Sequence, residues 1–284
     1  MNINNQLSIS EQLMSCTVRI VSTAGQIENG SGSSFLMAIA KHGDHQVIAL
    51  VTNKHVIENA NGIKFVLSHS AADGSDIQHA EMQMEIDPAR IIYHPGAIDL
   101  CAIPISWAIN YLVEHKRNLR HVILDEAICA KRELFDEILP LDSVVMIGYP
   151  NGLWDEVNNG AIARRGTLAS NPGKEFKGKP DFVVDMACFP GSSGSPIFLL
   201  DNGSYSDRSG NTILGGRCAL LGVLHSGPTA NVNGTIEIAP VPTGQVPFAR
   251  FKAMLNLGYA VKITELEPIR VEALARLESE LNAQ

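Results

Sequence analysis

Short β-type runs recur along almost the whole chain, and no other feature of the sequence limits its fold so strongly. Each run is rich in Val, Ile, Leu or Phe and is bounded by Gly, Asn, Ser or Pro. About a dozen such runs at this spacing are typical of an all-β sandwich or barrel. They fall into two groups of about six, which predicts two β domains. The first group comprises 17–22, 33–39, 46–52, 63–68, 90–93 and 100–103, and the second 143–148, 161–168, 182–186, 195–199, 218–224 and 258–263.

Helical patterns occupy the gap between the groups and the end of the chain. In 106–139, the stretches WAINYLVEHK and EAICAKRELFDEIL carry apolar residues at helical spacing among charges, which predicts helices between the domains. A terminal helix is expected after Pro268. One face of it would pack against the core through Val271, Leu274, Leu277 and Leu281. The stretches 202–216 and 227–244, rich in Gly, Asn and Pro, are predicted to be surface loops.

Charge and composition narrow the choice of partners. The 284 residues include 22 Lys plus Arg and 30 Asp plus Glu, a net charge of −8, which disfavours binding to a phosphate backbone. The first residues resemble no secretory signal, and apolar runs such as 47–51 fall far short of the roughly 18 residues of a membrane span. Five cysteines without a CxxC pair suggest packed, reduced thiols. We therefore expect a cytoplasmic protein with neither a nucleic-acid nor a membrane partner.

One Gly/Ser-rich turn between two β-type runs has the residues that nucleophilic catalysis needs. A serine that attacks a carbonyl requires an exposed Oγ and two backbone N–H donors for the developing oxyanion. In Gly191-Ser192-Ser193-Gly194, Ser193 would be the nucleophile, with the N–H groups of Gly191 and Ser193 as the oxyanion hole. Taken alone, the segment is equally compatible with an ordinary turn between strands.

A histidine and an aspartate follow apolar runs in the first half. His55 stands at the end of the run 47–52, where an imidazole could reach a cleft and exchange a proton near neutral pH. Asp99 lies between Ile98 and an apolar strand, where a carboxylate needs hydrogen-bond donors such as an imidazole N–H. Taken separately, each has a structural explanation: a satisfied, half-buried histidine and an aspartate that caps a strand.

The order His55, Asp99, Ser193 separates two kinds of hydrolase. An α/β-hydrolase has the order Ser, Asp, His, which only Ser193, Asp201 or Asp207, and His225 could supply. That arrangement leaves little chain for the intervening elements, and Ser195 stands where the G-x-S-x-G elbow requires glycine.

Together these segments resemble the trypsin/chymotrypsin-fold serine peptidases, and in particular the bacterial trypsin-like peptidase domains of intracellular type. The resemblance covers roughly residues 17–263. It rests on five signals: GSGSSF at 30–35, VTNKHV around His55, Asp-Leu-x-x-Ile at Asp99, GSSGSP around Ser193 and LGVLHSG at 221–227.

The resemblance implies an all-β fold of two six-stranded antiparallel β-barrels, chymotrypsin-like, with the active site between them. The expected division is an N-terminal barrel in 1–105, a helical connection in 106–139, a C-terminal barrel in 140–263 and a C-terminal helix in 264–284. In such an enzyme Ser193 attacks a peptide carbonyl, His55 takes its proton, Asp99 orients His55, and water hydrolyses the acyl-enzyme.

The same resemblance implies no metal and no cofactor. It implies a protein or peptide substrate, and such an enzyme should be restrained by an ill-formed oxyanion loop, by a regulatory protein partner or by narrow specificity. The alternative is a catalytically silent peptide-binding or scaffold protein that keeps this fold.

The chain departs from the secreted members of the family. Ser192 stands where those relatives commonly have an Asp that pairs with a freed N-terminus, and Val56 replaces a disulfide-forming Cys. By analogy, the walls of the specificity pocket would be 187–190 and 224–227, so its residues would be Ala187, Leu224, His225 and Gly227. Ala187 at the bottom lacks the acid that binds Lys or Arg, which favours an apolar or small residue at the cleavage site. His225 would either line this pocket or face Asp99.

Overall fold

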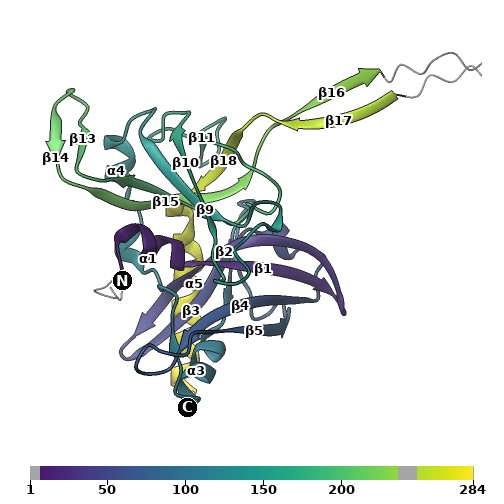
Figure 1. The fold of residues 1–284 in the computed structure, drawn as a ribbon. Helices are drawn as coiled ribbons and strands as arrows, with labels where there is room; N and C mark the ends of the chain where they lie inside the picture. The colour runs from purple at the N-terminus through teal and green to yellow at the C-terminus, as the bar shows by residue number, and fades with distance from the viewer. Residues whose placement is uncertain (1–6, 236–247, 284) are drawn as a thin grey trace, which may run out of the picture.

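Buried aliphatic side chains on paired strands build both halves of the molecule. The computed structural model describes residues 7–235 and 248–283, and Figure 1 shows an antiparallel sheet below a β-barrel. The N-terminal half contains helices α1 (Ile9–Ser15), α2 (Lys54–Ile57) and α3 (Ser106–Glu114). Its strands are β1 (Thr17–Ala24), β2 (Ile27–His42), β3 (His45–Thr52), β4 (Gly62–Ser70), β5 (Gln78–Glu85), β6 (Ile92–Tyr93), β7 (Cys101–Pro104) and β8 (Asn118–Leu119).

The N-terminal strands form one eight-stranded sheet. Its order is β5-β4-β1-β2-β3-β7-β6, and β8 pairs with β4 off this path. Residues 36 and 50 and residues 20 and 65 are paired across neighbouring strands, so that their apolar side chains share one core. Closure of this sheet into a six-stranded barrel, which the sequence leads us to expect, is not shown in the described part of the chain.

The C-terminal half does contain the expected closed six-stranded barrel, in the order β10-β11-β18-β15-β12-β9. Its strands are β9 (Ser143–Gly148), β10 (Ile162–Leu168), β11 (Asp181–Asp185), β12 (Pro196–Asp201), β15 (Arg217–Ser226) and β18 (Leu257–Lys262). The chain reaches it through the 3₁₀ turn η1 (Glu126–Ile128) and the helix α4 (Arg132–Glu137), and a second 3₁₀ turn, η2 (Pro150–Gly152), follows β9.

One hydrophobic core joins the two halves. It includes Leu13 of α1, Phe35 of β2 and Phe198 of β12, all of them at most 1% exposed. The last turn η3 (Ile263–Leu266) and the terminal helix α5 (Glu267–Asn282) belong to the same core. In Figure 1, α5 runs from the barrel down beside the N-terminal sheet, so that the terminal helix fastens one half to the other.

The structure corrects three sequence predictions. The stretch 126–139 is not one helix, because Cys129 forms a β-bridge with Leu220 and Ala130 donates its N–H to the Leu220 carbonyl between η1 and α4. Val271 of α5 is 60% exposed instead of packed, whereas Ile269, Ala273 and Leu277 are buried. Leu274, Leu277 and Leu281 pack against the core as predicted, and Ile269 and Ala273 extend the buried face in place of Val271.

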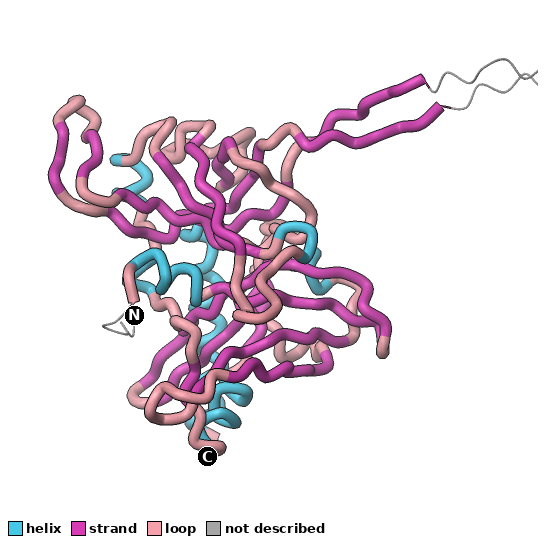
Figure 2. Tube along the Cα trace, viewed as in Figure 1, coloured by secondary structure: helices cyan, strands magenta, loops and turns pink. Residues whose placement is uncertain are grey.

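The third correction concerns the predicted loops, which contain β-hairpins. Strands β13 (Ser204–Ser206) and β14 (Thr212–Leu214) pair within 202–216, and β16 (Thr229–Thr235) pairs with β17 (Phe248–Met254). Figure 2 shows the strands of both hairpins as magenta tubes that project from the barrel. Residues 236–244 of the second predicted loop lie outside the described residues.

Candidate active site

Strand pairing in the N-terminal sheet brings His55 and Asp99 together. Strand β3 ends at Thr52, and His55 follows in the short helix α2. Thr52 pairs with Cys101 at the start of β7, so Asp99, two residues earlier in the chain, lies next to the same strand end. Asn53 Nδ2 donates to the Asp99 carbonyl oxygen at 2.7 Å and fixes this approach.

The carboxylate of Asp99 accepts two hydrogen bonds from His55. The backbone N–H donates to Oδ1 at 3.1 Å, and ring Nδ1 lies 2.5 Å from Oδ2. Burial raises the pKa of Asp99, but the hydrogen bonds and charge of His55 outweigh it, so that the pKa is lowered and the carboxylate stays ionised. When Nδ1 is the donor, the neutral ring keeps its lone pair on Nε2, where a general base needs it.

Ser193 lies in the turn between β11 and β12, on the barrel. Its Oγ donates to the His225 carbonyl at 3.3 Å, and its own carbonyl accepts the N–H of Ser33 at 2.7 Å. Among the described residues, no hydrogen bond joins Ser193 to His55. The structure thus pairs two of the three predicted catalytic residues directly and leaves the third with a backbone partner.

The two predicted oxyanion donors are free. In the described part of the chain, the N–H groups of Gly191 and Ser193 have no acceptor, whereas Ser192 donates to Phe189 and Gly194 donates to Leu224, at 3.0 and 2.8 Å. Gly191 and Gly194 have φ angles of +84° and +86°, which favour glycine. This backbone leaves two donors available for a developing negative charge.

Two neighbouring segments fix the turn. The Asn151 N–H donates to the Pro190 carbonyl at 2.5 Å, which holds the peptide group that carries the Gly191 N–H. The Ser33 hydroxyl donates to the Gly191 carbonyl at 2.9 Å and accepts the Tyr149 N–H at 2.9 Å. The motif GSGSSF pointed to this strand, but nothing in the sequence indicated these contacts of Ser33 or Asn151.

The residues predicted for the specificity pocket have different surroundings. Leu224 is 2% exposed and belongs to the core. Ala187 is half-buried, and Gly227 lies against the Leu257 carbonyl, where a Cβ would clash.

His225 has partners of its own, and its charge also helps to lower the pKa of Asp99. Its Nε2 lies 3.3 Å from Oδ2 of the buried Asp181, and its Nδ1 lies 3.0 Å from Ser226 Oγ. Its ring is also 6.5 Å from that of Tyr259.

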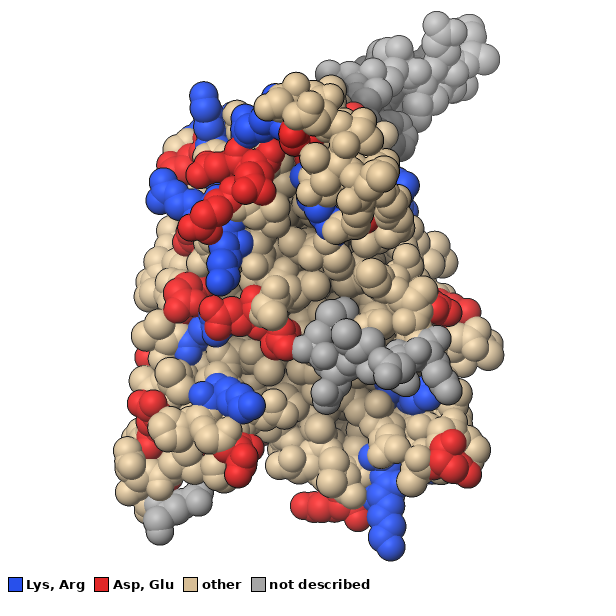
Figure 3. Space-filling model, turned by 90° about the vertical axis from the view of Figure 1, so that its left-hand side faces the viewer, with Lys and Arg blue, Asp and Glu red and all other residues tan. Residues whose placement is uncertain are grey.

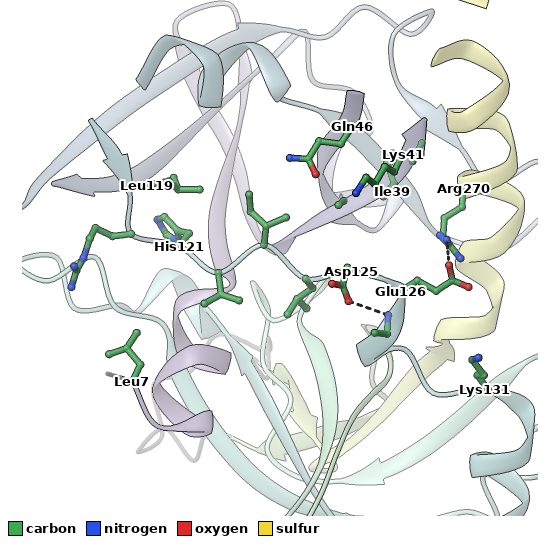
Figure 4. A pocket seen from close by; sticks show the side chains of 17 residues that line it. Leu7, Ile39, Lys41, Gln46, Leu119, His121, Asp125, Glu126, Lys131 and Arg270 are labelled. Carbon is green, nitrogen blue, oxygen red and sulfur yellow. Dashed lines mark hydrogen bonds and ion pairs between the residues drawn. The ribbon is translucent and has the colours of Figure 1, made fainter. Parts of the chain in front are cut away.

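Of two cavities in the structure, only the smaller one is lined by predicted catalytic residues. One of about 500 Å³ is lined by His55, Asp99, Lys54 and Tyr93 among others, and so touches the paired catalytic candidates. A larger cavity of about 940 Å³ lies along residues 119–127, with Lys41 and Gln46 opposite (Figure 4). Its charged groups include Glu126, which is bonded to Arg270. Since no predicted catalytic residue lines it, its size alone does not make it the active site.

Residues 7–235 and 248–283 contain neither a metal cluster nor a membrane-spanning helix. No group of three or more His, Cys, Asp or Glu in these ranges could hold a metal ion. No helix there is long and apolar enough to cross a membrane. On the face shown in Figure 3, acidic and basic side chains lie interspersed.

The sequence matches the model of the trypsin-like peptidase domain over residues 30–204, which is more than half of the chain. The chain therefore belongs to the trypsin-like peptidase family. It is a serine endopeptidase, as expected from its motifs, and its substrates are proteins or peptides. No curated protein matches the sequence.

Solved structures of serine proteases are similar to this chain at low identity. The serine endoprotease from Yersinia pestis is 14% identical, with a TM-score of 0.47, over 95% of this chain and 68% of that one. The Rv3671c protease from M. tuberculosis in its active form is 13% identical, with a TM-score of 0.45, over 92% and 82%. The thermostable serine protease AL20 from an extremophilic microorganism is 12% identical, with a TM-score of 0.46, over 92% and 98%.

Proposed function

We propose that this peptidase cleaves peptide bonds with Ser193 as nucleophile, His55 as general base and Asp99 as the residue that orients His55. The observation that carries the proposal is the 2.5 Å contact between His55 Nδ1 and Asp99 Oδ2. It fixes the ring and leaves Nε2 as the base. The free N–H groups of Gly191 and Ser193 add an oxyanion hole beside the nucleophile.

The reaction begins with a rotation of the Ser193 side chain. Its Oγ leaves the His225 carbonyl, to which it is bonded at 3.3 Å, and turns to His55 Nε2. As Oγ attacks the peptide carbonyl carbon, its proton passes to Nε2 and the carbonyl oxygen becomes an oxyanion between Gly191 and Ser193 N–H. The ionised Asp99 stabilises the imidazolium that forms.

Collapse of this intermediate breaks the C–N bond. The imidazolium returns its proton to the departing amine, and an ester between Ser193 and the acyl half of the substrate remains. Water then attacks the ester with His55 again as the base, so that the acid product leaves and Ser193 regains its proton. No step calls for a metal or a cofactor.

Further proposals concern organisation and setting. We propose that the chain divides into four parts. The first is an N-terminal domain in 1–105, which corresponds to the first barrel, and it is followed by a helical connection in 106–139, the closed barrel in 140–263 and the terminal helix in 264–284. An apolar or small residue remains our choice before the scissile bond, because Ala187 is half-buried and carries no charge. A regulatory protein partner is also part of the proposal.

We propose a cytoplasmic location as well. All five cysteines are free thiols, and burial raises the pKa of Cys16 and Cys129 to about 12 and that of Cys188 to about 11. Thiols held protonated in this way are suited to a reducing compartment.

A fluorophosphonate probe tests the mechanism. The folded protein should become labelled on Ser193, and Ser193→Ala should abolish labelling. Ser192→Ala is the matched control, because the Ser192 hydroxyl is buried and has no partner among the described residues. Labelling that survives in Ser193→Ala would contradict the assignment.

The competing function is a catalytically silent peptide-binding or scaffold protein. The observation in its favour is the absence of a His55–Ser193 hydrogen bond in the described part of the chain. That function predicts saturable peptide binding without labelling or turnover, so the same probe separates the two.

A further inference from the structure

A third cavity, smaller than the two described above, lies beside the turn that carries the proposed oxyanion hole. It has a volume of about 470 Å³ and is lined by Pro150–Gly152, Leu153, Trp154, Glu156, Arg164 and Phe189. Phe189 and Pro190 directly precede Gly191, and Asn151 holds the Pro190 carbonyl through its N–H. A ligand in this cavity would therefore contact the segment that carries the Gly191 N–H.

Arg164 brings an unpaired positive charge to this cavity. Its guanidinium lies 4.8 Å from the centre of the Phe189 ring, and its Nε is buried without a hydrogen-bond partner. In the described part of the chain it forms no ion pair, although the protein has a net charge of −8. Arg217 in the same half shows the contrast, since it binds both Asp142 and Asp201.

A second guanidinium lies behind one wall of the cavity. Arg19 is 5.5 Å from the centre of the Trp154 ring, and its Nε is likewise buried and unpartnered. The single acid in the lining, Glu156, is exposed and pairs with neither arginine. A buried donor without an acceptor costs free energy, and the guanidinium fork is best satisfied by a carboxylate.

We propose that this cavity binds a carboxylate of a peptide, which Arg164 holds while adjacent apolar atoms pack against Trp154 and Phe189. The inference rests on the proposed function and extends it. It says that the peptides bound by this enzyme carry an acidic group. Two sources share this chemistry: an acidic side chain and a free C-terminal carboxylate. The ring stacked on Arg164 keeps the guanidinium plane in place for either source.

Tryptophan fluorescence provides a direct test. The chain has two tryptophans, and Trp107 packs edge-on against Phe65 in the N-terminal half. The double variant Trp107→Phe, Ser193→Ala therefore reports on Trp154 alone and cannot cleave the probe. The probes are acetyl-Leu-Glu-amide, acetyl-Leu-Gln with a free C-terminus, and acetyl-Leu-Gln-amide, which carries no carboxylate.

The expected result is a saturable change with one or both of the acidic probes and none with the neutral amide. The probe that binds identifies the source of the carboxylate. Adding Arg164→Gln should weaken binding at least tenfold, which corresponds to about 1.4 kcal/mol. Adding Arg165→Gln, an exposed neighbour on the same strand, should leave it within twofold.

Three results would overturn the proposal: no saturation with either acidic probe, equal binding of the neutral amide, or unchanged binding in Arg164→Gln. Fluorophosphonate labelling of the Trp107→Phe protein is measured in parallel. Because labelling needs only Ser193 and its base, normal labelling with absent binding rejects the carboxylate site alone. Binding without labelling rejects the proposed mechanism and keeps the site.

Discussion

Ser33 joins the two halves of the enzyme at a single residue. Its N–H binds the Ser193 carbonyl, its hydroxyl binds the Gly191 carbonyl and the Tyr149 N–H, and its carbonyl accepts the Thr52 hydroxyl at 2.7 Å. The strand that supports the histidine and the turn that carries the nucleophile are therefore aligned through the backbone and the hydroxyl of one residue. Such alignment affects the transition state more than substrate binding.

Ser33→Ala should lower kcat about tenfold and change KM less than twofold. The variant loses the two hydroxyl hydrogen bonds, so the Gly191 peptide group is held less firmly. This loss is milder than removal of an oxyanion donor, which lowers kcat by about 10²–10³-fold. Steady-state kinetics on a peptide substrate measure both constants. Ser33→Thr, which keeps the hydroxyl, should restore kcat, and Ser31→Ala on the same strand serves as the control. A raised KM with unchanged kcat would reject the positioning role.

Gly194 is required for two separate reasons. Its φ angle of +86° disfavours any side chain, and a Cβ there would overlap the Ser33 carbonyl and the Thr52 hydroxyl. Gly194→Ala should therefore lower the free energy of unfolding by more than about 4 kcal/mol, at the extreme of single substitutions. Urea unfolding measures this loss.

Gly74→Ala separates the two reasons. Gly74 has a φ angle of +83° with open space around it, so its substitution should cost only the backbone term of about 1–2 kcal/mol. Similar losses of unfolding free energy in the two variants would show that the surrounding atoms move enough to remove the overlap at Gly194.

At the scale of elements, the buried face of α5 follows the prediction at Leu274, Leu277 and Leu281 and differs from it at Val271. The difference can be measured with Leu277→Ala and Val271→Ala. Leu277 is 8% exposed in the shared core, so its truncation should cost about 2–5 kcal/mol. Val271 is 60% exposed, and its truncation should change stability by no more than about 0.5 kcal/mol. Equal losses in chemical unfolding would mean that the predicted stripe packs after all.

Local patterns explain what the sequence could predict. The strands and the segments of His55, Asp99 and Ser193 are encoded in short runs of alternating or apolar residues and in Gly-bounded motifs, whereas the closed barrel was expected from the family resemblance. The Cys129–Leu220 bridge, the Ser33 contacts and the unpaired Arg164 depend on residues that meet only in the folded chain. A pattern in a single sequence does not reveal contacts between residues that are distant in the chain, so these features were predicted wrongly or not at all.

At the scale of the whole molecule, the connection between the halves also ties stability to pH. His121 lies in this connection, where its Nε2 accepts the Ser68 N–H of β4 at 2.9 Å and its Nδ1 donates to the Ser15 carbonyl of α1 at 2.9 Å. Burial lowers its pKa from 6.5 to about 4, against the raising effect of the bond to Ser15, while the charge of His79 lowers it slightly further. The neutral ring is therefore part of the folded state.

Between pH 6.5 and about 4 the unfolded chain binds a proton at His121 that the folded chain does not. Stability must then fall as the pH falls through this window, and it is fully present above it. We expect a loss of about 2 kcal/mol from this group between pH 7 and pH 4.5. Urea unfolding across that range should show a shallower decline in His121→Gln, whose amide can replace both hydrogen bonds without titrating. Parallel curves for the two proteins would mean that His121 has the same pKa in the folded and unfolded states and does not contribute to acid unfolding.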